Sequence, residues 1–230
     1  MISDSSSPSE RQSFSGCRFS LSVMSDDFVP VILGAIETLG KPGDLRIETD
    51  DLSTLLIGPP RRVFQAVQGV YAEACRRGGH VTLSALFSRG CPGEPGDPLC
   101  TPPDRAPSLA GEVQAPPPEE GIPVSAHFSL YPLGDPGYMA TIARAITSVQ
   151  DDGVFGGASH FCTRLEGDIS RVFASILKTF ESVTADTPHV VLHLTASKGS
   201  PSKKPVQKQP VQKENPHPDN QNQESSRENS

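Results

Sequence analysis

The sequence predicts an α+β protein made of two tandem copies of one small fold. The first observation is an internal repeat, because a shift of 109 residues matches the chain to itself without a gap over about seventy positions. The second is the succession of strand-like and helix-like hydrophobic patterns within each copy. The matched pairs include Phe19/Phe128, Ser20/Ser129, Asp26/Asp135, Thr54/Thr163, Leu56/Leu165, Gly58/Gly167, Phe64/Phe173, His80/His189 and Leu83/Leu192.

The first half of each copy is predicted to be a strand followed by a helix. Residues 19–23 alternate apolar and polar side chains, which is the period of a half-buried strand. Residues 28–39 place apolar side chains along one side of a helix, and Ser25 to Asp27 supply N-cap chemistry before it. The segment Lys-Pro-Gly-Asp at 41–44 ends this helix.

The second half of each copy is predicted to be two strands, a helix and a last strand. Residues 45–49 and 52–57 form the two strands, and Gly-Pro-Pro at 58–60 begins the helix, because proline fits the first turn. Gly78-Gly79 ends that helix, and residues 81–87 alternate as a strand. The resulting order, β-α-β-β-α-β, is the ferredoxin-like arrangement.

We therefore expect antiparallel sheets covered on one face by helices, with the second copy's helices near Met139–Val149 and Ile169–Val183. The other face stays uncovered and must meet water, a ligand or another sheet. The two copies could pack face to face or edge to edge, and the residues leave both arrangements open. The uncovered face is predicted to carry Ser20, Ser22, Thr82 and Ser84 in the first copy and Ser129, Tyr131, Val191 and His193 in the second.

Proline-rich segments separate the first copy from the second and follow the second copy. Ten of the 23 prolines lie within residues 88–124 and five more within 198–230, where few side chains can be buried. We therefore predict repeats at 14–90 and 123–198, a proline-rich acidic linker at 91–122 and a disordered tail at 199–230.

Composition excludes several classes of protein. A formal charge of −7 and a pI near 5.3 argue against nucleic acid as the main partner, and no apolar stretch is long enough to span a membrane. The first dozen residues lack the features of a signal peptide, and the five cysteines form no CxxC pair. We expect a cytoplasmic protein with free thiols, no metal and no cofactor. The nucleotide-binding, metalloprotease and serine-hydrolase motifs are absent.

Two polar segments are candidates for a binding site. They occupy equivalent positions at the turn between the second and third strands, as ETDDLST at 48–54 and SHFCT at 159–163. Carboxylates, hydroxyls and an imidazole there could bind a cationic or amine-rich heterocycle, although Asp50 and Asp51 could equally serve the turn. His160 and Cys162 could share one face, but no oxyanion hole or third orienting group accompanies them, so we expect no enzyme.

At these motifs the chain resembles the YkoF family. The runs RFSLSVMSDDFVPVILGAI, TDDLST and HVTLSALFSRG resemble its first half, and VSAHFSLYPLGDPGYM, SHFCTRLEGDISRVF and HVVLHLTAS resemble its second half. The resemblance covers most of 16–90 and 123–198. It implies a tandem ferredoxin-like protein that binds thiamine or its hydroxymethylpyrimidine moiety, serves uptake or salvage, forms a homodimer and is not an enzyme.

The resemblance also implies where the ligand binds, in one crevice per repeat. A carboxylate could accept from the pyrimidine amine or pair with the thiazolium cation, hydroxyls could serve the ring nitrogens, and Tyr131 could stack. One departure is that Ser22 and Val23 stand where the second copy and the family have Tyr-Pro, so we expect an altered affinity in the first copy. The candidate ligand-binding residues are Ser20, Thr49, Asp50, Asp51, Ser53, Ser129, Tyr131, Ser159, His160 and Cys162.

Two other functions remain as alternatives. The open sheet faces could pair with another protein in an interaction or regulatory module that binds no small molecule. A small-molecule enzyme using His160 and Cys162 is the third possibility. Ligand-driven stabilisation distinguishes the first alternative from a binding protein, and turnover that is lost in Cys162→Ala would identify the second.

Overall fold

The computed structural model describes residues 14–41, 43–90 and 119–202, and within them both repeats have the predicted order β-α-β-β-α-β. The predictions of disorder for 203–230 and for most of the linker lie outside the described residues. The first repeat contains β1 (Ser15–Val23), α2 (Phe28–Ile36), the short 3-10 helix η1 (Glu37–Leu39), β2 (Arg46–Thr49), β3 (Thr54–Gly58), α3 (Pro60–Arg77) and β4 (Val81–Arg89). The second contains β5 (Pro123–Leu133), α4 (Tyr138–Asp151), β6 (Phe155–Ser159), β7 (Cys162–Asp168), α5 (Ile169–Asp186) and β8 (His189–Lys198).

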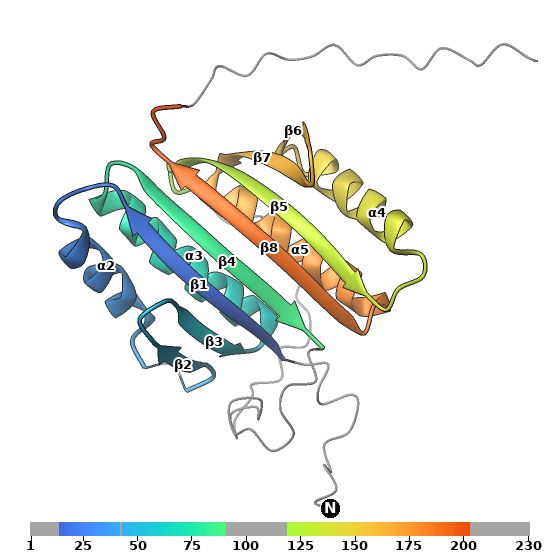
Figure 1. Ribbon diagram of the computed structural model, residues 1–230, viewed down its shortest axis with the longest axis horizontal. Coiled ribbons are helices and arrows are strands. Elements are labelled where there is room, and N and C mark those ends of the chain that lie inside the picture. The colour runs from blue at the N-terminus through green and yellow to red at the C-terminus, as the bar shows by residue number, and fades with distance from the viewer. Residues whose placement is uncertain (1–13, 42, 91–118, 203–230) are drawn as a thin grey trace, which may run out of the picture.

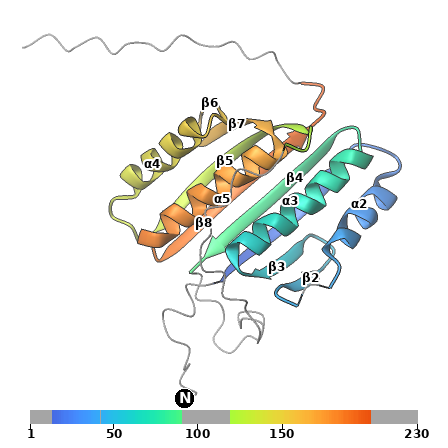
Figure 2. The ribbon, with the colours of Figure 1, turned by 180° about the vertical axis from the view of Figure 1, so that it is seen from behind.

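The two repeats join edge to edge into one eight-stranded sheet. The strand order is β2-β3-β1-β4-β8-β5-β7-β6, and every neighbouring pair is antiparallel. The four α-helices lie on one side of this sheet, as the two opposite views show (Figures 1 and 2). The other side is uncovered, as the sequence predicts, and we call it the open face.

The sheet has an approximate twofold axis at the join between β4 and β8. Ala85 of β4 pairs directly with Leu194 of β8, and these residues are themselves equivalent under the 109-residue repeat. This pair lies on the axis, and residues next to it in β4 lie close to their repeat equivalents in β8. Ser84 Oγ and His193 Nε2, for example, lie 3.2 Å apart on the open face. The repeat in the sequence therefore corresponds to an approximate twofold symmetry of the fold.

The core beneath the sheet runs without interruption from one repeat to the other. Phe64 of α3 stacks on Phe87 of β4, with ring centroids 3.9 Å apart, and lies 5.5 Å from Phe180 of α5. The symmetry repeats the cross-repeat contact, because Tyr71 lies 6.4 Å from Phe173. All five rings are almost fully buried. Burial of this kind contributes roughly 2–3 kcal/mol per large apolar side chain, so each repeat stabilises the other.

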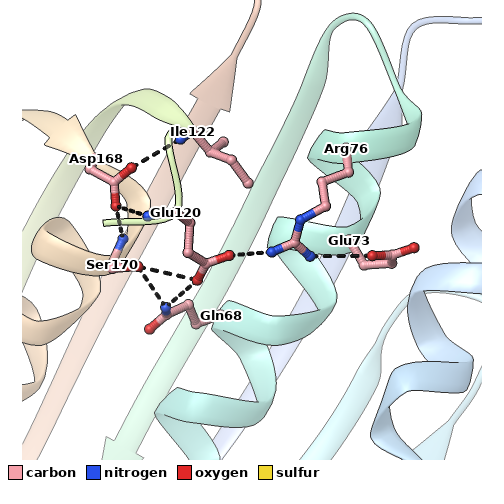
Figure 3. Close-up of polar contacts among 7 residues, drawn as sticks. All are labelled: Gln68, Glu73, Arg76, Glu120, Ile122, Asp168 and Ser170. Carbon is pink, nitrogen blue, oxygen red and sulfur yellow. Dashed lines mark hydrogen bonds and ion pairs between the residues drawn. The ribbon is translucent and has the colours of Figure 1, made fainter. Parts of the chain in front are cut away.

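Polar contacts tie the repeats together on the helix side as well (Figure 3). Residues 119–122 precede β5, and Ile122 is buried although it falls within the predicted linker. The Glu120 carboxylate accepts hydrogen bonds from Gln68 of α3 at 2.8 Å and from Ser170 of α5 at 3.2 Å, and it pairs with Arg76. The folded second repeat therefore begins a few residues earlier than its first strand.

Helix starts differ from the sequence-based expectation. The predicted side-chain cap of α2 is not formed, since Asp27 makes no cap hydrogen bond and Ser25 Oγ instead accepts the Asp27 N–H at 3.2 Å. The Asp168 side chain does cap α5 by accepting the Ser170 N–H at 2.9 Å. Among the described helices, none is both long enough and apolar enough to cross a membrane.

Candidate functional site

The open face brings together predicted site residues from both repeats. Ser20 of β1 lies opposite Ser84 of β4, and Ser129 of β5 lies opposite His193 of β8. Residues next to these serines along their strands are buried or packed on the helix side, so alternation directs the serines to the open face. Tyr131 follows the same rule and is 49% exposed.

In the first repeat, the turn between β2 and β3 bends toward the open face. Arg18 of β1 is an open-face residue, and its Nη1 donates to Asp50 Oδ2 at 3.2 Å and to Ser53 Oγ at 3.0 Å. The register also assigns Ser20 to this face, two residues along β1 from Arg18. We refer to Arg18, Ser20, Asp50 and Ser53 as the first-repeat site.

Asp50 also holds the turn together. Its Oδ1 accepts the N–H groups of Leu52 at 2.9 Å and Ser53 at 2.7 Å, which is the usual turn role of aspartate. Those backbone bonds, followed by the contact with Arg18, hold the pKa of the Asp50 carboxyl below its ordinary value. Asp50 is therefore a carboxylate at neutral pH. Its bonds to the Leu52 and Ser53 N–H groups agree with the interpretation that this aspartate stabilises the turn.

Thr49 and Asp51 lie apart from this group. The Thr49 hydroxyl is 3.0 Å from that of Thr54, and Thr54 pairs with the buried Phe19, so Thr49 points to the helix side of the sheet. Asp51 is exposed within the turn and forms no side-chain hydrogen bond among the described residues. The geometry thus brings Ser20, Asp50 and Ser53 together but separates Thr49 from them.

In the second repeat, the turn between β6 and β7 also bends over the open face. Ser129 Oγ donates to the carbonyl of Phe161 at 3.0 Å, which ties this turn to β5. Ser159 pairs with Cys162 across the turn, and Cys162 faces away from the buried Thr163. We refer to the following residues as the second-repeat site: His127, Ser129, Tyr131, Ser159 and Cys162.

Each turn also carries one apolar side chain that nothing covers. Phe161 is 97% exposed with a φ of 67°, and its ring centroid lies 6.2 Å from that of His160. Its repeat equivalent, Leu52, is 80% exposed. The two turns therefore present an exposed apolar side chain at equivalent positions of the repeat.

The two sites flank a central strip along the β4–β8 seam. In this strip, Ser84 contacts His193, and Leu86 is 44% exposed. At the end of the seam, His80 Nε2 lies 3.2 Å from Ser197 Oγ of the other repeat. His80 therefore takes part in a side-chain contact between the repeats.

Two hollows of the structure, each near 400 Å³, lie away from the predicted site residues. One lies between α4 and α5 and the other lies beside η1. Within residues 14–41, 43–90 and 119–202, no group of three or more His, Cys, Asp or Glu side chains could hold a metal ion. Burial raises the pKa of the thiols of Cys17 and Cys75, the latter to about 11, so these cysteines are not thiolates.

Sequence reasoning missed three residues beside the two sites, namely Arg18, His127 and Phe161. Arg18 alternates with Ser20 and Ser22 along one strand, so its position on the open face was predictable from the same period that placed the serines. Its contact with Asp50, 32 residues away, had no sequence signal. Phe161 occupies a turn, where no periodicity indicates the direction of a side chain.

Comparison with known proteins identifies the family of this chain. The sequence pattern of the YKOF-related Family matches residues 14–94 and again residues 123–203, and each match contains one repeat of the structure. A protein of Bacillus subtilis (strain 168), named "Putative HMP/thiamine-binding protein YkoF", is 31% identical over 194 residues. That alignment covers 82% of this chain and 92% of the relative. The chain belongs to the YKOF-related family.

Proposed function

We propose that this protein is a non-catalytic binding protein for thiamine or its hydroxymethylpyrimidine moiety, with one site per repeat on the open face. The observation that carries the proposal is the shared position of the two turns, each of which leans over the open face beside a strand serine. The name of the relative from Bacillus subtilis supports the same class of ligand.

The chemistry of the sites suits an aminopyrimidine. The amine of the ring donates hydrogen bonds and its nitrogens accept them, while a serine hydroxyl can do both. Ser20 and Ser129 supply hydroxyls on the open face, and Tyr131 supplies a half-exposed aromatic face against which the ring can stack. We further propose that binding serves uptake or salvage of the pyrimidine in the cytoplasm.

Calorimetric titration with hydroxymethylpyrimidine and with thiamine tests this function. We expect saturable binding of at least one of them and a rise in the unfolding temperature at saturating ligand, because a ligand that binds only the folded state stabilises it. An absence of heat and of thermal stabilisation up to millimolar concentrations of both compounds contradicts the proposal. It would favour a module that binds only a protein partner on the open face.

We also propose that two copies of the chain associate through their open faces. The apolar side chains exposed on this face include Leu86 and Tyr131 near the centre and Leu52 and Phe161 at the turns. A second copy would cover these side chains and would enclose the flat sites, which is the usual role of a large exposed apolar surface.

Sedimentation of the full chain tests the homodimer. We expect twice the chain mass of 24.5 kDa at micromolar concentration, and Leu86→Lys should shift the protein to monomer by placing a charge in the interface. Leu33→Lys on α2 is the matched control, because Leu33 is 58% exposed on the helix side. A monomeric wild-type protein, or a dimer lost only in Leu33→Lys, contradicts association through the open face.

A further inference from the structure

The histidines of the described residues all gather at the open face. Alternation directs His127 of β5 and both His189 and His193 of β8 to this face, because the residues next to them in their strands are buried. His80 lies at the end of the β4–β8 seam, and His160 lies in the turn that bends over the face. Within the described ranges, the helix side carries no histidine.

Two of these histidines lie within the surface that a second copy would cover. His193 lies opposite Leu86 of β4, whose exposed side chain belongs to the proposed interface. His127 lies one strand further out, opposite Thr195 of β8 on one side and Arg164 of β7 on the other. Association through the open face therefore removes water from both imidazoles.

No carboxylate is placed to balance a positive charge on these imidazoles. The described Asp and Glu side chains form no ion pair with a histidine. The open-face positions of β4, β5 and β8 hold no Asp, Glu, Lys or Arg, and the charged residue opposite His127 is itself the cation Arg164.

The permanent charges elsewhere on this face nearly cancel one another. They are Arg18 with Asp50 at 3.2 Å, Arg164 with Glu166 at 2.6 Å, Arg46 and Glu48 along β2, and Asp51 in the first turn. Protonated histidines would therefore give the open face a net positive charge. Two copies that meet through this face would then bring like charges together.

Building on the proposed association of two copies, we infer that the open-face histidines make this association pH-dependent, so that it weakens as the pH falls from 8 to 6. Histidine is the side chain that changes its charge in this range. A covered imidazolium loses its water without gaining a partner, and the imidazolium groups of the two copies repel one another. The associated form therefore binds fewer protons than two separate chains, and acid favours the separate chains. Because the second copy encloses the two sites, acidification uncovers them.

Sedimentation of the full chain at pH 8, 7 and 6 tests this inference. We expect the dissociation constant between copies to rise at least about tenfold from pH 8 to pH 6, since each imidazole that must stay neutral contributes up to about tenfold per pH unit. The double variant His127→Gln, His193→Gln keeps neutral hydrogen-bonding side chains, so its dissociation constant should rise less than about threefold. Each single variant should show an intermediate rise, and the result then does not depend on the double variant being folded.

The control is Arg144→His on α4, which adds a histidine at an exposed position of the helix side and should keep the wild-type pH dependence. Circular dichroism verifies that each protein stays folded at each pH. Wild-type association of equal strength at pH 8 and pH 6 overturns the inference while the proposed association stands, and so does a double variant as pH-dependent as the wild-type protein. If the wild-type protein is monomeric at every pH, the proposed association fails and this inference fails with it.

Discussion

Asp168 lies on the helix side of the molecule, where its carboxylate accepts hydrogen bonds from three backbone N–H groups. One of its oxygens accepts the N–H groups of Glu120 at 3.1 Å and Ser170 at 2.9 Å, and the other accepts the N–H of Ile122 at 2.9 Å (Figure 3). Burial alone would raise the pKa of this carboxyl, but these three backbone bonds outweigh burial and lower it. The equivalent residue in the first repeat, Pro59, has no such side chain.

This arrangement predicts a pH-dependent contribution to stability. A carboxyl whose pKa is lowered by folding stabilises the protein above its unfolded pKa of about 3.9, and the contribution disappears as the pH falls through the folded pKa. At neutral pH, Asp168→Ala should lower the free energy of unfolding by about 1–3 kcal/mol, because it removes a helix cap and leaves three N–H groups unpaired.

Urea denaturation at pH 7 and at pH 3 measures both effects. Asp168→Asn is the matched variant, since it keeps a cap acceptor but cannot titrate, and it should lose less stability than the wild-type protein over this pH range. Equal pH dependence of the wild-type protein and Asp168→Asn would show that Asp168 makes no such contribution.

Single residues divide clearly into those that sequence could place and those that it could not. Alternation along β1 and β5 correctly predicted that Ser20 and Ser129 face away from the helices. The bonds from Asp168 to the N–H groups of Ile122 and Glu120 join residues 46 and 48 positions apart, and the exposure of Phe161 depends on a left-handed turn conformation. Neither has a periodic signal in the sequence.

At the scale of elements, the ends of β4 and β8 are fixed by two equivalent glycines. Gly90 and Gly199 follow these strands and have φ values of 80° and 74°. A Cβ at Gly90 would lie 1.8 Å from the carbonyl oxygen of Pro188, and one at Gly199 would lie 2.1 Å from that of Gly79. Each glycine thus lets one repeat's last strand end against the backbone of the other repeat.

Alanine at either position should therefore destabilise the protein. We expect Gly90→Ala and Gly199→Ala each to lower the free energy of unfolding by at least about 1–3 kcal/mol, because the left-handed conformation and the backbone clash add together. Chemical denaturation measures the loss. Gly79→Ala is the control, since open space surrounds it and its φ is not positive, and it should change stability far less. Equal effects at Gly79 and Gly90 would contradict this explanation.

Most elements were predictable because each has a local signal. Hydrophobic periodicity predicted all four α-helices, and the helices of the second repeat extend only one to three residues beyond the predicted limits, at 138–151 and 169–186. The missing cap of α2 shows where such signals fail. A run of Ser and Asp favours capping, but the actual backbone of the turn decides which oxygen meets which N–H.

At the scale of the whole molecule, duplication created one sheet and not two separate domains. The β4–β8 seam joins the repeats within the sheet, and the aromatic contacts of Phe180 with Phe64 and Phe87 join them on its helix side. The sequence left face-to-face and edge-to-edge packing open, because neither arrangement leaves a local pattern in the sequence. The pairing of β4 with β8 in the structure shows that the repeats join edge to edge. The edge-to-edge join leaves one long open face with a binding site proposed toward each end.

The most direct test of the account is backbone amide NMR of the full chain during titration with hydroxymethylpyrimidine and thiamine. We predict saturable shifts in β1, β5 and the turns at 50–53 and 159–162, with α3 and α5 almost unchanged. Shifts confined to the helix side would contradict the proposed location of the sites. An unchanged spectrum at millimolar concentrations of both ligands would contradict the binding function itself.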